Sequence, residues 1–483
     1  MTEKVTKPRP RKKRDSKVPI RERSRDKQPQ ESPNLQIRTT DLDLTLPAPV
    51  ALVSTTPNFN PAIIGRPPPE GVDPLTALRW RYRLPMYFQP NMEDIFDRAF
   101  ISHFIAVNNP GQVPLNVQLP WITKIPDMQA YSNKPALRLS IRAASMAFYG
   151  KVHQDMAVLT DSYKWYVKGL NYQRQSIQSL DPRSIPSDDD ILVPIILALY
   201  EVFAGTTPMS VFHHLAAATK ILDMKGPANC TSTVSSTLFK AMRVSESHKA
   251  LIFNRPSVLS TPDWLTIPFD GEPKNALHSL TDVLLAIPGC IGLCGIEGSL
   301  GDFFSARLPD TTDLLPVRAR TRQLLQEVDA WADRYPHLCS TAPSPQTLRM
   351  DLSARSLSDP PGIPTIMVPG TFAALIASSF YSARMTLALL LDKITPILPT
   401  SQSPGWSIME DARSHTKSIL QIAEFLELTN PVGFDFIRSI FPLVVVSNIA
   451  PLEEDRSRAM TMLERWGKKR AVSGLAGAKW IGN

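Results

Sequence analysis

The chain has 483 residues, of which 43% are hydrophobic and 20% are charged, enough apolar material for one large core or two ordinary ones. This composition excludes a chain that is disordered throughout. Four cysteines, Cys230, Cys290, Cys294 and Cys339, form no disulfide framework, and the charged N-terminus lacks the apolar segment of a signal peptide. Secretion is therefore not expected.

The net charge of +8 is concentrated in the first 40 residues. They hold 13 Lys and Arg against 5 Asp and Glu, so the 40 basic and 40 acidic residues of the remainder balance. This segment contains several prolines and no aromatic residue. Such a composition predicts a solvated, disordered basic tail.

Six cationic side chains form a cluster within this tail: Lys7, Arg9, Arg11, Lys12, Lys13 and Arg14. A cluster of this kind is typical of a nuclear-import signal, which predicts a nuclear protein that binds the import machinery. The same side chains are suited to contacts with DNA phosphates that do not depend on base sequence. The remaining alternative is a solvated tail without a binding function.

Residues 35–74 are rich in proline and poor in charge, which predicts an extended linker. We therefore expect a disordered basic tail and Pro-rich linker over residues 1–74 and one all-helical domain over residues 75–483. The spacing of Ile95, Ala99 and Phe104 predicts the second of two short helices at the start of this domain.

Two amphipathic helices follow in the chain. The first has Leu137, Ile141 and Phe148 at helical spacing, and we expect Gly150 to end it. The second is predicted to place five large side chains on one buried face: Met156, Leu159, Tyr163, Tyr166 and Leu170.

The next two helices have recognisable ends. One is expected to begin at Ser187 or within residues 188–190, whose carboxylates suit the free amides of a first turn, and Pro194 starts or bends it. The other is predicted to begin at Thr206 or Thr207, with Pro208 in its first turn. Its predicted buried face consists of Val211, Leu215, Ala218 and Leu222, and Lys225, Gly226 and Pro227 mark its end.

The order of the motifs YEVF and HHLAAATKILDMKGP resembles the regulatory domain of fungal zinc-cluster transcription factors. In that family a Tyr-Glu pair ends one helix, and a His-Leu-x-Gly-Ala helix ends in paired leucines and an Arg-Gly-Pro cap. The residues in these places here are Tyr200, Glu201, His214, Leu215, Ile221, Leu222, Lys225, Gly226 and Pro227. Ala217 stands where glycine is usual.

The resemblance continues after this motif. Arg255 matches an arginine in a short loop, and Trp264 matches a Pro-x-Trp that precedes an extended Ile-Pro, here Ile267 and Pro268. We interpret Trp264 as a packed anchor, because a lone tryptophan usually buries its area against a core.

The resemblance spans roughly residues 74–483 and implies a fungal transcription regulator in the nucleus. Its fold would be all-α, a multi-helix bundle or helical-repeat-like regulatory domain that senses, restrains or dimerises. Its partners would be a second copy or other transcription proteins. DNA binding in this family rests on six cysteines that hold two zinc ions. No cysteine precedes Cys230, so zinc is expected only if a cluster lies upstream of this chain.

Three long apolar runs, residues 191–200, 371–391 and 441–446, are predicted to be buried helices rather than membrane spans, and no membrane partner is expected. Further helices are predicted over residues 275–295 and 314–335. The second of these should bury Val317, Ala319, Leu324, Val328 and Trp331. No β-pattern of any length is present.

Residues with the potential for chemistry are few. His213 and His214 diverge on a helix, and we expect His214 to be partly buried and bonded to Glu201. Cys290 and Cys294 are interpreted as core residues, and the aspartates at 188–190 as capping residues rather than metal ligands.

No motif of a hydrolase elbow, phosphate-binding loop or zinc protease is present. We therefore assign no catalytic, cofactor-binding or metal-binding residue and expect a protein that is not an enzyme. Two alternatives remain open. One is an accessory regulator without a zinc cluster that works through protein–protein contacts, and the other is an unrelated helical enzyme or ligand-binding protein.

Overall fold

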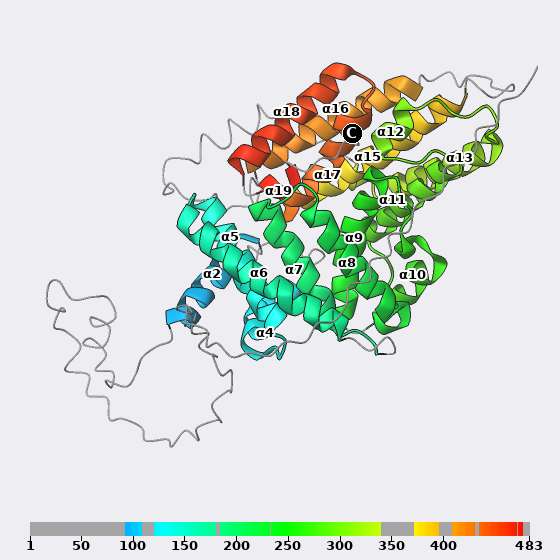
Figure 1. Cartoon of the computed structure of the whole chain (residues 1–483). Coiled ribbons are helices and arrows are strands. Elements are labelled where there is room, and N and C mark those ends of the chain that lie inside the picture. The colour runs from blue at the N-terminus through cyan, green and yellow to red at the C-terminus, as the bar shows by residue number, and fades with distance from the viewer. Residues whose placement is uncertain are drawn as a thin grey trace, which may run out of the picture. The chain divides into compact units, whose positions relative to one another are not determined.

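The computed structural model describes residues 92–108, 120–179, 184–231, 233–339, 371–395, 408–429, 434–470 and 472–476. All regular structure in these ranges is helical and none of it is strand (Figure 1). The prediction of an all-α, multi-helix fold is therefore confirmed. The basic cluster at residues 7–14, the linker and the expected boundary at residues 74 and 75 lie outside the described residues.

The contacts within the chain divide it into Met1–Phe88 and Gln89–Asn483, and every described residue belongs to the second unit. Its first half contains the helices α2 (Met92–Asn108), α3 (Pro120–Thr123), α4 (Ile125–Tyr131), α5 (Pro135–Val152), α6 (Met156–Gln178), α7 (Asp188–Ala204), α8 (Ser210–Lys225) and α9 (Thr233–Ile252).

The remaining α-helices are α10 (Pro262–Thr266), α11 (Ala276–Gly292), α12 (Leu300–Ser305), α13 (Leu314–Arg334), α15 (Thr371–Ile394), α16 (Ile408–Thr429), α17 (Phe434–Ile449), α18 (Glu453–Lys469) and α19 (Ser473–Ala476). Short 3₁₀ turns connect several of them: η2 (Pro227–Asn229), η3 (Val258–Ser260), η4 (Ile267–Phe269) and η5 (Pro336–Leu338).

Helix α7 is enclosed by its neighbours, and residues 190–203 are all buried. It packs on α5 along one side and on α8 along another. A helix that is apolar all round is stable only when it is covered in this way. Its first turn is closed by a capping box, in which the Ser187 side chain accepts from the Asp190 amide and the Asp190 carboxylate accepts from the Ser187 amide.

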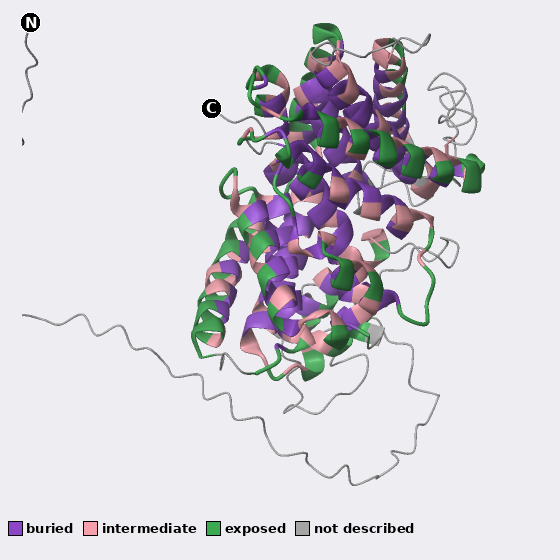
Figure 2. Cartoon of the chain, turned by 90° about the vertical axis from the view of Figure 1, so that its right-hand side faces the viewer, coloured by how far each residue is buried: buried purple, intermediate pink, exposed green. Residues whose placement is uncertain are grey.

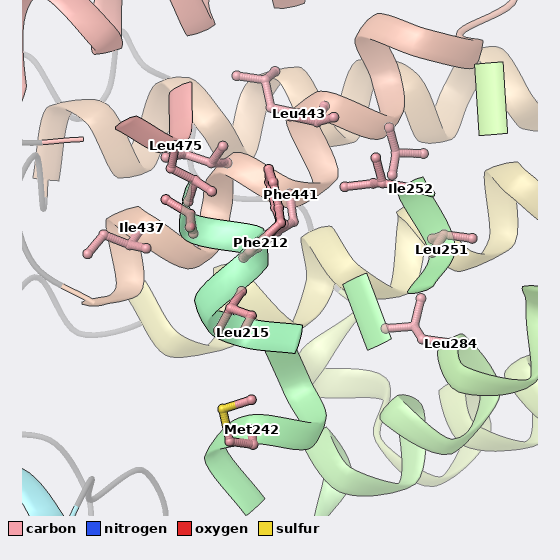
Figure 3. Packing of buried hydrophobic residues seen from close by; sticks show 14 of the residues in the cluster. Phe212, Leu215, Met242, Leu251, Ile252, Leu284, Ile437, Phe441, Leu443 and Leu475 are labelled. Atoms are coloured by element: carbon pink, nitrogen blue, oxygen red, sulfur yellow. The ribbon is translucent and has the colours of Figure 1, made fainter. Parts of the chain in front are cut away.

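Side chains from both halves of the unit meet in one hydrophobic core. Figure 3 shows Phe212 and Leu215 of α8 near Phe441 of α17 and Leu475 of α19. The buried residues follow the inward faces of the helices, while exposed residues cover the outer faces (Figure 2). Burial of this apolar area is the main driving force that holds distant segments together.

The three long apolar runs are buried, as predicted. Helix α15 is long and apolar enough to cross a membrane by length and composition, but 89% of its most apolar window is buried against the rest of the protein. The runs at residues 191–200 and 441–446 lie in α7 and α17 and are buried throughout.

The predicted end of α5 was wrong. Gly150 lies inside the helix, which continues to Val152. A Cβ on Gly150 would lie 2.9 Å from the Asp155 carbonyl oxygen and 3.1 Å from the Leu159 Cβ. Glycine therefore serves the close approach of α5 to the start of α6, and not the termination of α5.

The predicted buried face of α6 was also wrong in part. Met156 is 66% exposed and Tyr163 is 50% exposed, whereas Tyr166 is buried. The residues buried on this helix are Ser162, Tyr166, Gly169 and Gln173. Small residues lie at the contact because α5 comes very close: a Cβ on Gly169 would be 3.0 Å from the Ser140 hydroxyl.

Helix α8 begins later than expected. Its N-cap is Met209, so neither Thr206 nor Thr207 caps it. Thr206 instead binds the carboxylate of Glu201. The predicted buried face of α8 is confirmed, and Lys225 is its last helical residue.

Three smaller expectations also change. In α2, Ile95 and Ala99 are exposed, whereas Phe104 is buried as predicted. In α13, Ala319 is exposed and Thr321 takes its place on the buried face, because residues 317, 321, 324, 328 and 331 share one side of the helix.

Candidate functional site

Helices α6, α7 and α8 bring four polar and aromatic side chains together. The rings of Tyr166 and Tyr200 are stacked, with centroids 4.2 Å apart and planes 10° from parallel. The Tyr166 hydroxyl lies 3.0 Å from Nε2 of His214. Glu201, beside Tyr200 on α7, is 0% exposed. We call Tyr166, Tyr200, Glu201 and His214 the α7 polar network.

The carboxylate of Glu201 is satisfied by groups at the end of its own helix. It accepts from the Thr206 amide at 2.9 Å and from the Thr206 hydroxyl at 2.6 Å. The expected bond between His214 and Glu201 was wrong, because His214 pairs with the Tyr166 hydroxyl. The Tyr166 ring stacks on Tyr200, the neighbour of Glu201 in the chain, so Tyr166 connects His214 to α7.

Burial keeps the network's histidine and tyrosines neutral. It lowers the pKa of His214 to about 4, with a smaller effect from the charge of His213. Burial raises the pKa of Tyr200 to about 12, and burial followed by the influence of the nearby Glu201 raises that of Tyr166 further. None of these three pKa values lies near neutral pH, where a general acid or base works best. The contacts among Tyr166, Tyr200 and His214 are therefore those of a polar connection between helices.

The opposite end of α7 is connected to α8 by Lys225. The side chain of Lys225 is buried, and its Nζ donates to the Pro186 carbonyl at 3.0 Å and lies 3.0 Å from an Asp188 carboxylate oxygen. Asp188 also accepts from Ser235 at the start of α9. Pairing with a carboxylate and a carbonyl offsets the cost of burying the ammonium.

The three neighbouring aspartates have different partners. Asp189 accepts from the Ser132 hydroxyl at 2.8 Å, and Asp190 pairs with Lys134 while it closes the capping box of α7. Consecutive residues on a helix point about 100° apart, which explains why these carboxylates do not converge. They act as capping and ion-pairing groups.

The residues after Pro227 that carry the family resemblance have structural roles. Trp264 is buried and stacks on Phe239 with ring centroids 5.4 Å apart, which confirms its interpretation as an anchor. Arg255 is an exposed loop residue after α9. Ile267 and Pro268 lie in the η4 turn directly after α10 and are therefore not extended.

Cys290 of α11 and Cys294, just after the end of this helix, are core residues, as interpreted from the sequence. Cys290 and Cys294 are both buried, and burial raises the pKa of each thiol, that of Cys294 to about 11. The Cys290 sulfur lies 3.4 Å from the Thr321 hydroxyl of α13. Within the described part of the chain, no three His, Cys, Asp or Glu side chains gather in an arrangement that could hold a metal ion.

Sequence reasoning missed a buried cation. Arg243 of α9 is 0% exposed, donates to the His278 carbonyl at 3.0 Å and pairs with Asp282 of α11. The Phe269 ring lies 5.0 Å from its guanidinium carbon. The available signal was its spacing, because Arg243 follows the buried Phe239 by four residues and so shares its helix face.

A shallow groove of about 540 Å³ lies on the surface of α11 and α13. Its lining is mostly small or apolar: Leu285, Ala286, Gly289, Cys290, Leu293, Pro316 and Ala319, with Ser260, Arg320 and Gln323 as polar members. Leu293 in this lining is 51% exposed. This groove was not predicted from the sequence, because it depends on how two helices pack.

The chain is 22% identical, over an alignment of 191 positions, to an uncharacterized protein of Emericella nidulans. The match covers 37% of this chain and 39% of that protein, so it spans about two fifths of the relative's length. No protein-family model matches the chain, and no solved structure matches it.

Proposed function

We propose that this protein is a fungal transcription regulator that acts through its helical body. The proposal rests on the resemblance of residues 200–227 to a regulatory-domain motif, and one structural relationship supports it. The motif residues connect α7 to α8 at both ends: His214 bonds to Tyr166, whose ring stacks on Tyr200, and Lys225 joins Asp188 and Pro186. The spacing of the motif therefore has a packing reason. The match to a fungal protein is compatible with this origin.

In this proposal the body regulates through contacts with a second copy or with other transcription proteins. The apolar groove on α11 and α13 favours protein contacts, because exposed apolar surface is typical of interaction sites. Base-specific DNA reading is assigned to no residue, since the sequence has no cysteine cluster. The cationic residues 7–14 provide nuclear import and phosphate contacts that do not depend on base sequence.

A tethering experiment tests the regulatory role. The chain is fused to an unrelated DNA-binding domain, and the output of a reporter gene is measured in a fungal host. We expect a change of at least several-fold in either direction. Leu215→Asp, which places a charge in the core, should abolish it, whereas Ala216→Asp on the exposed side of α8 should not. If the fusion is well folded and the output of the reporter gene does not change, the result would contradict a regulatory function.

Import is tested separately with a fluorescent fusion. The protein should concentrate in nuclei, and replacing Lys12, Lys13 and Arg14 by alanine should release it. The matched control replaces Arg21, Arg23 and Arg25, which removes the same charge from another part of the tail. If the two triple variants show the same nuclear concentration, residues 7–14 are not the import signal.

DNA binding by this chain alone should be weak and salt-sensitive. Footprinting at about 0.15 M salt should show no discrete site, because counterion release dominates contacts made only to phosphates. A defined footprint would instead assign base reading to this chain and would correct the proposal.

A further inference from the structure

Helix α2 is held on α5 by three kinds of contact. Asp97 accepts from the Arg142 side chain at 2.6 Å, and Phe104 packs edge-on against Phe148 with centroids 5.4 Å apart. The third contact lies near the end of α5, where His103 of α2 meets His153. Outside α5, α2 also contacts α4, and the Phe104 ring meets Phe203 of α7 with centroids 6.2 Å apart. Of these contacts, the one between the two imidazole rings depends on where their protons lie.

The two histidines face each other through the same ring atom. Nε2 of His103 lies 3.1 Å from Nε2 of His153, and the ring centroids are 5.0 Å apart. The Tyr149 ring packs against both, at 5.3 Å and 4.3 Å. At this separation the gap accommodates one proton, in an N–H···N hydrogen bond with one donor and one acceptor.

The burial of His103 decides which ring donates. Its Nδ1 is buried and has no hydrogen-bond partner among the described residues. A proton on that atom would leave a buried donor unsatisfied, which is costly. We therefore assign the proton of neutral His103 to Nε2. This N–H group donates a hydrogen bond to the unprotonated Nε2 of His153. His153 is exposed, so its Nδ1–H can face water.

We propose that His103 and His153 form an acid-sensitive latch that holds α2 on α5. When His153 gains a proton on Nε2, two N–H groups face each other and the hydrogen bond is lost. The alternative is that His103 accepts this proton at Nε2, and this requires its own proton to move to the buried, unpartnered Nδ1. Either route weakens the attachment of α2 as the pH falls.

The surrounding charges do not replace this interaction. Asp97 of α2 and Arg142 of α5 neutralise each other, and Asp155 is occupied as the N-cap of α6. Lys151 is the basic residue in the last turn of α5, and its side chain is partly buried. Burial and then the charge of His153 lower the pKa of His103, so a positive charge on the His103 ring is disfavoured.

Hydrogen exchange on the full chain tests the latch at pH 7.5 and pH 5.5, with EDTA present and intrinsic rates corrected for pH. Amide protection of residues 92–108 should fall about tenfold more in the native protein than in His153→Gln. A glutamine there can accept from His103 but carries no titrating group. The reciprocal His103→Gln should also remove the pH sensitivity, whereas His213→Gln, at an exposed histidine of α8, should retain it.

Two outcomes would overturn the proposal. One is a pH response of residues 92–108 that is the same in the native protein and in both glutamine variants at positions 103 and 153. The other is a rise in α2 protection when Zn²⁺ is added at pH 7.5 without EDTA, lost in both variants, which would make the pair a metal site. A metal-binding histidine normally donates its second ring nitrogen to a partner, and His103 Nδ1 has none among the described residues.

Discussion

Gly474 of α19 lies directly against the backbone of Glu201 in α7. A Cβ on Gly474 would be 1.8 Å from the Glu201 carbonyl oxygen and 2.9 Å from the Cα of Gly205. Gly205 adopts a positive φ of 66° and ends α7. The Ser473 hydroxyl donates to the Phe203 carbonyl at 2.9 Å in the same place. The C-terminal segment is therefore seated on the end of α7 that carries the polar network.

Gly474→Ala should destabilise the protein by about 1–3 kcal/mol, because the new methyl group would displace backbone atoms rather than a flexible side chain. Chemical denaturation measures the loss. The control is Gly289→Ala in α11, where a Cβ meets nothing within 4 Å. That change should stabilise by about 0.5–1 kcal/mol through helix propensity. Equal effects of the two substitutions would mean that α19 does not dock on α7.

Asp282→Asn should cost about 2–3 kcal/mol of unfolding free energy. The substitution leaves the guanidinium of Arg243 in the core without its anion, and an uncompensated buried charge is costly. Lys240→Met removes a cation from the same turn of α9, but its partner Glu272 is 70% exposed. Its cost should stay within about 1 kcal/mol. A smaller loss for Asp282→Asn than for Lys240→Met would show that Arg243 is solvated.

Tyr166→Phe should lower the free energy of unfolding by about 1–3 kcal/mol. The hydroxyl that it removes is the hydrogen-bond partner of His214 Nε2, and its loss leaves this half-buried ring nitrogen without that partner. Tyr163→Phe, on the exposed side of the same helix, should change stability by less than about 0.5 kcal/mol. If the two variants are equally stable, the polar network does not contribute to stability.

Stability should fall as the solution becomes acidic. Burial lowers the pKa of His248 to about 4 and of His278 to about 3, against 6.5 for an ordinary histidine. The unfolded chain therefore binds these protons first, and stability is lost as the pH falls from about 6.5 toward the folded pKa values. Each such histidine contributes a slope of about 1.4 kcal/mol per pH unit within this window.

Unfolding midpoints at pH 7.5, 6.5 and 5.5 test this slope. His248→Gln should reduce it by one histidine's contribution, and His213→Gln, at an exposed position, should leave it unchanged. A flat stability profile between pH 6.5 and pH 5 would show that these histidines gain protons in the folded state.

The sequence by itself determined the fold class and most of the helices. The apolar runs of α7 and α15, the buried face of α8 and the capping residues before Asp188 are local signals, each carried by residues within a few turns of one another. Periodicity reports such spacing directly. The anchoring role of Trp264 was predictable for a similar reason, because large aromatic side chains usually bury their area.

The tertiary structure decided which residues meet. Periodicity did not show which flank of α6 is buried, because small residues at Ser162 and Gly169 permit a closer contact than the larger side chains beside them. It did not show that His214 pairs with Tyr166, or that Ser473 binds the backbone of Phe203 across 270 residues of sequence. Local spacing sets the face that a helix buries, whereas contact partners depend on how separate helices pack against one another.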